Sequence, residues 1–230
     1  MVKVKICGIT NLKDAAAACS YGADAIGFVF AKSPRRVSPE TARSIIKRLP
    51  PYIATVGVFV NEDKGKVRRI AADCGLHCLQ FHGDETPEYC NYFKSKYKII
   101  KAVRVRDNNS LADLNKYNVD AFLLDSYVQG KRGGTGVKFN WNLAVKAKRY
   151  GKPVILAGGI RIENVKDAIK KVRPYAIDVS SAIESAPGRK DHNLMKAFIG
   201  KIHKMSFPCK RESRDVVIGA KNAGSPLPRG

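Results

Sequence analysis

Residues 2–20 read VKVKICGITNLKDAAAACS, a short apolar run with β-branched residues followed by a helix-like run over residues 11–20. This strand-then-helix pattern recurs eight times along the chain. The strand-like runs lie near residues 2–7, 24–30, 53–60, 77–82, 97–103, 120–125, 153–157 and 175–180, and the helix-like runs near 11–20, 40–48, 63–74, 87–94, 109–116, 140–149, 162–171 and 191–204. Parallel strands need a crossover connection, usually a helix, and eight such units close a barrel. The sequence therefore predicts an α/β fold, a single (β/α)₈ TIM barrel; an open doubly wound sheet, which usually has fewer strands, is the alternative.

The expected helix starts agree with these strands. Ser38-Pro39-Glu40 and Thr86-Pro87-Glu88 each supply an N-cap hydroxyl, a proline at the first helical position and an acid in the first turn. Thr10 and Asp191 are the expected caps of the first and last helices.

The composition is that of an ordinary globular protein, with 230 residues, 44% hydrophobic and 27% charged. No apolar run approaches the roughly 18 residues of a membrane span. The first residues alternate apolar and basic side chains and lack the core of a secretory signal, so we expect a cytoplasmic protein. The six cysteines have no framework spacing, which favours a reduced compartment over a disulfide scaffold.

The net charge of +22 comes from 42 basic and 20 acidic residues. Such a field can favour anionic substrates, nucleic acid or membrane surfaces. The lysines are spread along the chain rather than gathered in one block, which favours a solvated surface and neither a nucleic-acid nor a membrane partner.

The end of the chain departs from the repeating pattern. No amphipathic helix or barrel strand is recognisable after residue 205, so we predict a barrel domain over 1–205 and a disordered C-terminal extension over 206–230. A functional basic tail is the alternative.

Active sites of (β/α)₈ barrels lie at the C-terminal ends of the strands. The residues that end these strands, or follow them directly, are therefore the candidate site: Cys7, Arg35, Arg36, Gln80, His82, Asp125, Gly158, Gly159, Asp178, Ser180 and Ser181.

Cys7 and Asp125 are the candidates for acid–base chemistry. Cys7 ends an apolar strand, where a cysteine is either a buried small apolar residue or a reactive thiolate. Asp125 ends the run 121–124, where partial desolvation disfavours the ionised form and suits a general acid; a helix-cap or salt-bridge aspartate is the alternative. Arg35 or its neighbour Arg36 can clamp a carboxylate with a planar fork, the other being a surface residue.

The ends of strands seven and eight look like an anion site. Gly158 and Gly159 allow a close backbone approach just before a predicted helix, and Ser180 and Ser181 add hydroxyl and N–H groups. Phosphate often binds at these two loops of the barrel, although two ordinary turns would also need glycine. The glycine-rich loop 130–136 suits a mobile cover or a plain exposed loop.

A metal site is a weaker interpretation. Cys74, His77, Cys78 and His82 have tempting spacings, but they fall where a helix ends and a strand begins, so the side chains would not converge. The sequence predicts neither a metal nor a cofactor.

The chain carries a series of short motifs, which are KICGIT (5–10), GFVF (27–30), SPR (33–35), VGVFVN (56–61), LQFHG (79–83), LD (124–125), GGTG (133–136), AGG (157–159), DVSS (178–181) and PGRKD (187–191). As a set, and in this order, they resemble the phosphoribosylanthranilate isomerase family over residues 1 to 204.

The resemblance implies a cofactor-free Amadori rearrangement in L-tryptophan biosynthesis. N-(5-phosphoribosyl)anthranilate becomes 1-(2-carboxyphenylamino)-1-deoxyribulose 5-phosphate, so the partner is a small anionic substrate. By the family pattern Asp125 is the general acid that opens the ribose ring, and Cys7 is the general base that removes the C2 proton. Arg35 falls where the family binds the anthranilate carboxylate. We expect the first helix and the basic charge to favour the Cys7 thiolate, and the assembly to be a monomer or a homodimer.

Three features of the sequence depart from the family pattern. Ala182 stands where glycine is usual, which would weaken phosphate binding if that position needs positive φ. Arg161-Ile162 replaces a cap-and-proline pair, so the helix that follows is less well capped. The extension over 206–230 has no family counterpart.

Other functions remain as alternatives. A metal-dependent sugar-phosphate epimerase would need a cluster of His and Asp ligands at the strand ends, which His82 alone does not supply. Indole-glycerol-phosphate synthase would need a catalytic lysine in a longer N-terminal region. A basic barrel that binds nucleic acid would be indifferent to Cys7 and strongly salt-dependent.

Overall fold

The computed structural model describes residues 1–126 and 140–206. Eight parallel strands pair in sequence order and close into a barrel, in which the last strand pairs with the first. They are β1 (Lys3–Cys7), β2 (Ala25–Val29), β3 (Ala54–Phe59), β4 (Cys78–Phe81), β5 (Lys98–Val105), β6 (Ala121–Ser126), β7 (Val154–Leu156) and β8 (Ala176–Val179). The predicted (β/α)₈ barrel is confirmed.

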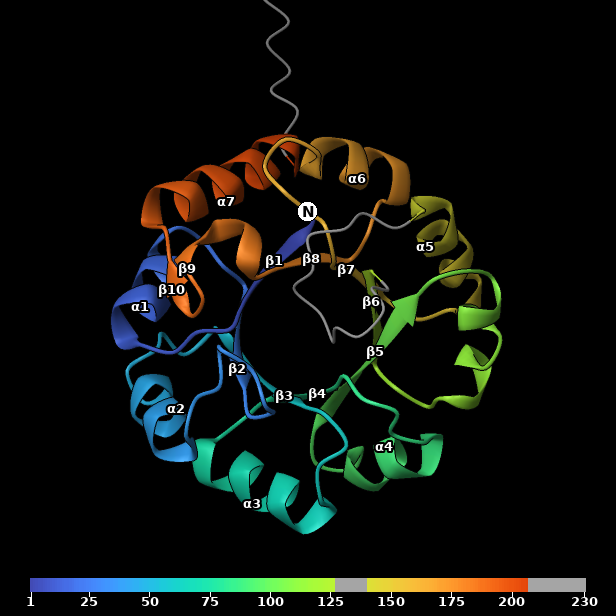
Figure 1. Cartoon of the computed structure of the whole chain (residues 1–230), viewed down its shortest axis with the longest axis horizontal. Helices are drawn as coiled ribbons and strands as arrows, with labels where there is room; N and C mark the ends of the chain where they lie inside the picture. Colours follow the sequence, from blue (N-terminus) through green and yellow to red (C-terminus); the bar gives the residue numbers. More distant parts are fainter. Residues whose placement is uncertain (127–139, 207–230) are drawn as a thin grey trace, which may run out of the picture.

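Helices form a ring outside the barrel (Figure 1). They are α1 (Leu12–Ser20), α2 (Pro39–Ile46), α3 (Lys64–Cys74), α4 (Pro87–Phe93), α5 (Trp141–Ala147), α6 (Val165–Val172) and α7 (His192–Ser206). The larger apolar core lies between this ring and the strands, and it includes the fully buried Phe28, Phe122 and Phe198. A smaller cluster around Leu123 and Ile155 fills part of the barrel interior.

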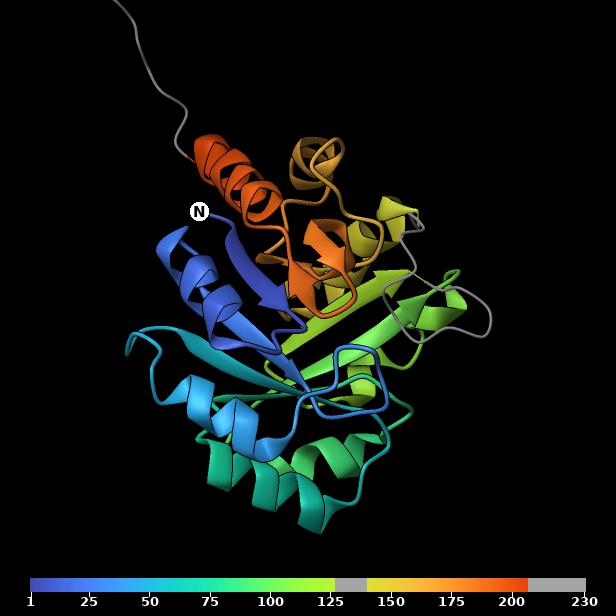
Figure 2. The same cartoon turned by 60° about the vertical axis from the view of Figure 1, so that its left-hand side comes forward.

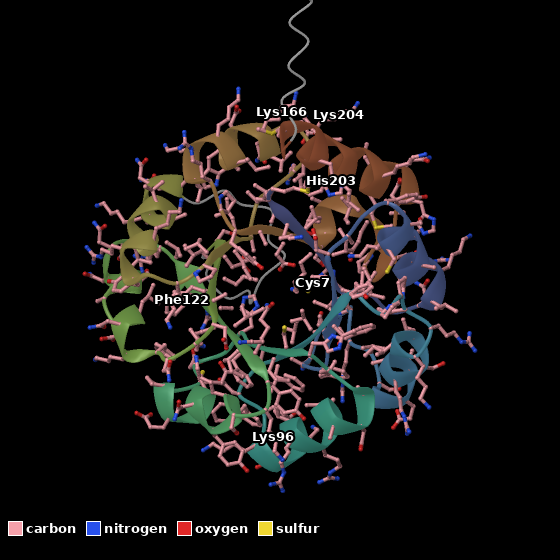
Figure 3. The ribbon with its side chains drawn as sticks, turned by 180° about the vertical axis from the view of Figure 1, so that it is seen from behind. Cys7, Lys96, Phe122, Lys166, His203 and Lys204 are labelled. Carbon is pink, nitrogen blue, oxygen red and sulfur yellow. The ribbon has the colours of Figure 1, made fainter. Side chains whose placement is uncertain are left out.

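In Figure 3, Lys96, Lys166 and Lys204 lie at the ring of helices, whereas Cys7 lies toward its middle. Lys96, Lys166 and Lys204 are all exposed. This arrangement agrees with a solvated lysine-rich surface.

The predicted proline-containing helix starts are confirmed. Ser38 accepts a hydrogen bond from the backbone N–H of Thr41, and Thr86 accepts one from that of Tyr89, both at 3.2 Å. Asp191 likewise accepts from backbone N–H groups at the start of α7. These bonds satisfy donors that have no partner within the helix.

The expected cap of the first helix is wrong by one residue. Asn11, not Thr10, caps α1, since its side chain accepts from the N–H of Asp14 at 2.9 Å. Thr10 instead donates its hydroxyl to the carbonyl of Gly188 at 2.6 Å, which ties the end of the first βα unit to the last one.

Two other segments differ from the predicted elements. The helix expected over 109–116 is two short 3₁₀ turns, and the residues after β8 form a further 3₁₀ turn and a small antiparallel hairpin that periodicity did not indicate. These elements are η1 (Asn109–Leu111), η2 (Leu114–Lys116), η4 (Ser181–Ile183), β9 (Glu184–Ala186) and β10 (Arg189–Lys190), with a fourth 3₁₀ turn, η3 (Lys148–Tyr150), after α5. The hairpin lies at the end of the barrel to which the arrow of β1 points (Figure 2).

Two sequence predictions fall where nothing is described. The glycine-rich loop over 130–136 lies outside the described residues, as does the predicted extension over 206–230 apart from Ser206, with which α7 ends. None of the described helices is long and apolar enough to cross a membrane.

Candidate active site

A cavity of about 1070 Å³ opens at the C-terminal ends of the strands. All of the predicted site residues line it, namely Cys7, Arg35, Arg36, Gln80, His82, Asp125, Gly158, Gly159, Asp178, Ser180 and Ser181. The structure thus brings together side chains that are up to 174 residues apart in the sequence, from Cys7 to Ser181.

Cys7 ends β1 and lines this cavity, and the residue is 8% exposed. Its register partner on β2 is Gly27, where a Cβ atom would lie 2.8 Å from the Cys7 Sγ atom and 3.2 Å from the Cε atom of Lys5. A side chain at position 27 would therefore displace the thiol. Glycine on β2 keeps open the space that Cys7 and Lys5 share.

Lys5 is the buried cation beside the thiol. It is 3% exposed, and its Nζ atom donates to Asp178 Oδ1 at 2.9 Å and to Gln80 Oε1 at 3.0 Å. Lys5 and Cys7 are two residues apart on β1, so strand alternation points both side chains into the barrel. Lys5 was not among the site residues predicted from the sequence, although this alternation was the signal that indicates it.

Burial raises the pKa of the Cys7 thiol, and the nearby positive charges of Lys5 and Lys190 offset only part of this effect. The negative charge of Asp178 acts in the same direction as burial. The expectation that the basic surroundings lower this pKa is therefore wrong, because the cost of desolvating the thiolate exceeds the stabilisation that the two lysines give it.

Asp125 ends β6 on another side of the cavity and is 3% exposed. Its Oδ1 atom accepts from the N–H of Ser126 at 2.8 Å, and its Oδ2 atom lies 3.3 Å from the Nε2 atom of His82. Neither partner is a strong cation, so this carboxyl group is not locked into a buried salt bridge with lysine or arginine among the described residues. That environment leaves it available for proton transfer.

A row of hydrogen-bonded polar side chains runs from the neighbourhood of Cys7 to that of Asp125. Lys5 donates to Gln80 Oε1, so the amide nitrogen of Gln80 faces His82 Nδ1, at 3.2 Å. This amide therefore donates to Nδ1. The Nε2 atom of His82 faces Asp125 but forms no hydrogen bond with a described residue. Hydrogen bonds thus link Asp178, Lys5, Gln80 and His82 in a row, and Asp125 lies next to the end of this row.

Gly158 has a structural role besides the predicted one in phosphate binding. Its φ is +69°, and a Cβ atom there would collide with Asp125 Oδ1 and with the backbone nitrogen of Ser126. Gly158 therefore makes room for the Asp125 carboxyl, whereas Gly159, with φ +64°, lines the cavity beyond it. The helix expected directly after this pair begins only at Val165.

The loop after β8 retains the features of an anion site. Ser180 and Ser181 lead into η4, and the buried Ser180 hydroxyl has no hydrogen-bond partner among the described residues. A buried hydroxyl without a partner is costly unless a ligand or water satisfies it. Ala182 is not in the left-handed region of backbone conformation, so the glycine of the family pattern is not needed there for positive φ.

The α6 start agrees with its sequence prediction. Asn164 occupies the N-cap position without a side-chain bond to the helix, and it instead accepts from the N–H of Arg161 and donates to the carbonyl of Gly159. The predicted weak cap is confirmed, and the Asn164 side chain instead holds the loop at Gly159 by a hydrogen bond.

Arg35, rather than Arg36, is the half-buried member of the arginine pair, and Arg36 is exposed. Arg35 forms a bidentate ion pair with Glu184, with Nε–Oε1 and Nη2–Oε2 distances of 2.8 and 2.6 Å. Glu184 in turn accepts from Lys190, which also binds the Cys7 carbonyl at 2.7 Å. Glu184 and Lys190 were not among the site residues predicted from the sequence; the Pro-Gly turn between them was the available signal.

Three of the four residues considered for zinc have other contacts or places in the structure. Cys74 donates to the carbonyl of Pro39 at 3.3 Å, and His77 accepts from the backbone of Thr55 at 3.1 Å. His82 faces the cavity. No group of three or more possible metal ligands gathers within residues 1–126 and 140–206.

Comparison with known proteins agrees with this geometry. The model of the N-(5'phosphoribosyl)anthranilate (PRA) isomerase family matches residues 4–201. The N-(5'-phosphoribosyl)anthranilate isomerase of Moorella thermoacetica is 53% identical over 205 residues, covering 89% of this chain and 91% of the relative. That of Pelobacter propionicus is 50% identical over 200 residues, covering 86% and 94%.

Solved structures give the same result. Phosphoribosyl anthranilate isomerase from Thermotoga maritima matches with a TM-score of 0.83 and 43% identity, covering 88% of this chain and 99% of that one. A phosphoribosyl anthranilate isomerase in complex with reduced 1-(o-carboxyphenylamino)-1-deoxyribulose 5-phosphate matches with a TM-score of 0.80 and 42% identity, covering 88% and 99%. The chain belongs to the N-(5'-phosphoribosyl)anthranilate isomerase family of enzymes.

Proposed function

We propose that this chain converts N-(5-phosphoribosyl)anthranilate into 1-(2-carboxyphenylamino)-1-deoxyribulose 5-phosphate in tryptophan biosynthesis, with Cys7 as general base and Asp125 as general acid. The observation that carries the assignment is the placement of a thiol from β1 and a carboxyl from β6 in one cavity. A relative's complex with a reduced form of this product supports the choice of ligand.

The reaction needs one proton donor and one proton acceptor. Asp125 donates a proton to the ring oxygen of the ribose, the bond from C1 to that oxygen breaks, and the nitrogen lone pair forms a C1=N double bond. The Cys7 thiolate then removes the proton from C2, and the electron pair of that C–H bond forms a C1=C2 double bond while the nitrogen regains its lone pair. The enol that results becomes a ketone when its hydroxyl loses a proton and C1 gains one.

This sequence of steps is an internal redox change. C1 is reduced and C2 is oxidised, so the atoms balance without an external oxidant, reductant, metal or cofactor. Positioned acid and base groups of this kind contribute about 10²–10⁴-fold each to the rate.

The remaining residues bind the two anionic ends of the substrate. Arg35 faces the carboxylate of the anthranilate ring, for which its planar guanidinium is suited. Ser180, Ser181 and Gly159 receive the phosphate, where the unpartnered Ser180 hydroxyl gains the partner that it lacks.

We further propose that the enzyme is cytoplasmic. All five cysteines within the described residues are free thiols, which fits a reduced compartment. A relative from Thermotoga maritima is described as dimeric. Analytical ultracentrifugation decides between a monomer and a homodimer for this chain.

Complementation tests the function. The chain is expressed in a tryptophan auxotroph that lacks this isomerase, alongside Cys7→Ala and the control Cys19→Ala, a cysteine on α1 that does not line the cavity. Growth without tryptophan is expected for the unchanged chain and for the control. No growth with the unchanged chain, or equal growth with Cys7→Ala at matched expression, would contradict the proposal.

A further inference from the structure

The hairpin after β8 brings a carboxylate against the cavity arginine. Glu184 and Arg35 are 149 residues apart, and they form three hydrogen bonds: Nε to Oε1 at 2.8 Å, Nε to Oε2 at 3.0 Å and Nη2 to Oε2 at 2.6 Å. The Glu184 side chain is 4% exposed, and the side chain of Arg35 is 17% exposed. The pair therefore sits at the edge of the cavity with its carboxylate on the protein side.

Lys190 fixes this carboxylate from behind. Its side chain is fully buried, and its Nζ atom donates to Glu184 Oε1 at 2.8 Å, to the Cys7 carbonyl at 2.7 Å and to the Ser180 carbonyl at 3.2 Å. Moving Glu184 away would leave a buried ammonium without its counter-ion, which is strongly unfavourable. Glu184 is thus a fixed part of the site and not a mobile occupant of the place that a substrate carboxylate would take.

The geometry of the guanidinium group leaves one edge for a ligand. Arginine has five N–H donors in a planar fork, and a carboxylate pairs with two parallel donors along one edge. Glu184 occupies the Nε/Nη2 edge of Arg35. The Nη1 nitrogen donates to no described residue, so the outer Nη1/Nη2 edge can bind a second carboxylate.

The backbone beneath Arg35 restricts it further. At Gly8, whose φ is +75°, a Cβ atom would lie 2.6 Å from the Cδ atom of Arg35 and 3.0 Å from the Oγ atom of Ser180. The arginine stem therefore lies directly on the backbone that follows Cys7. Its orientation is set on one side by this packing and on the other by Glu184.

The charges in this group leave a net positive charge. Burial by itself would raise the pKa of the Glu184 carboxyl, but the hydrogen bonds from Arg35 and the charge of Lys190 outweigh it and lower the pKa below its usual value. Burial lowers the pKa of Lys190, and the charge of Glu184 opposes this effect. The formal charges of Arg35, Lys190 and Glu184 sum to +1, which a single carboxylate would neutralise.

We propose that Glu184 is a positioning residue that turns the outer edge of Arg35 toward the aromatic carboxylate of the substrate. This makes Glu184 a determinant of specificity for a carboxyphenylamino sugar phosphate over the same compound without the carboxylate. The inference rests on the proposed function, since it assigns the Arg35 ligand to the anthranilate end.

The test compares Glu184→Gln with the unchanged enzyme on two substrates, N-(5-phosphoribosyl)anthranilate and N-(5-phosphoribosyl)aniline. For the anthranilate substrate we expect KM to rise about tenfold or more, the scale of a lost charge-assisted hydrogen bond, with kcat within about threefold. For the aniline substrate we expect no change in kcat/KM. In the background of Arg35→Met, Glu184→Gln is expected to have no further effect on the preference between the substrates.

Two further variants test whether a loss of folding, rather than a loss of positioning, explains the change in KM. Glu184→Asp keeps the charge with a shorter side chain and is expected to lose part of the preference. Asp120→Asn removes a half-buried carboxylate that pairs with Lys98 at 3.1 Å outside the cavity, and it is expected to leave both KM values unchanged.

Several results would overturn the proposal. A lower KM in Glu184→Gln would mean that Glu184 competes with the substrate, and equal losses on both substrates would mean that its role is structural only. A binding measurement shows whether a failure lies in this proposal or in the proposed function. Calorimetry measures the affinity of the chain for the reduced product and for the same compound without its carboxylate. If the unchanged chain prefers the carboxylated ligand but has no turnover, only the catalytic assignment fails; if it binds both equally, the specificity proposal fails.

Discussion

Replacing Gly158 by alanine tests whether this glycine serves the catalytic acid or the phosphate. The residue has φ +69°, a conformation that costs a side-chain-bearing residue about 1–2 kcal/mol. For a domain of this size that loss lowers Tm by about 2–8 °C. In addition, the new Cβ atom would occupy the place of Asp125 Oδ1 and of the Ser126 backbone nitrogen.

The second effect separates the two explanations. Asp125 has to move by on the order of 1 Å, and misplacement on that scale costs about 10²-fold in rate. We therefore expect Gly158→Ala to lower kcat about 10²-fold with KM within about threefold. A glycine needed mainly for phosphate would instead raise KM and leave kcat unchanged.

Gly151 provides the matched control. Its φ is +70°, and no atom lies within 4 Å of the place that its Cβ would take. Gly151→Ala carries the conformational cost alone, so we expect it to lose only the roughly 2–8 °C of Tm that this cost implies, measured by calorimetry, with kcat unchanged. Steady-state kinetics on both variants decides the matter. A Gly158→Ala enzyme with normal kcat and a raised KM would refute the reasoning.

Two further predictions follow from the surroundings of the thiol and of the phosphate loop. The charge of Lys5 lowers the pKa of Cys7, and that of Asp178 raises it. Lys5→Met should therefore slow alkylation of the thiol at neutral pH, and Asp178→Asn should speed it, as measured by the pH dependence of iodoacetamide labelling. A change in the same direction in both variants would contradict the assignment. Because Ala182 does not have positive φ, Ala182→Gly should leave KM within about twofold in steady-state assays, and a tenfold fall in KM would show that alanine obstructs the site.

The barrel was predictable because its signal is local. Each strand is a run of β-branched and apolar residues, and helix starts such as Ser38-Pro39 act within one turn. The helix predicted over 109–116 was wrong because the apolar spacing of this segment fits a single helical turn as well as a longer helix. The chain forms two 3₁₀ turns there.

The site was predictable only in part. The strand-end rule placed Cys7 and Asp125 in the cavity, because strand direction fixes where each strand ends. Glu184 and Lys190 were missed because two- and three-residue strands have no readable period, and their partners lie far away in the sequence. The direction of the Cys7 pKa was missed for the same reason, since it depends on a balance between burial and distant charges.

The most direct measurement of the central claim is the turnover of purified Cys7→Ala and Asp125→Ala on N-(5-phosphoribosyl)anthranilate at saturating concentration, beside the unchanged enzyme and Cys19→Ala. The proposed roles predict that each of the first two variants loses at least about 10²-fold in kcat while the control keeps its rate. Near-normal turnover in either folded variant would contradict the assignment of base and acid.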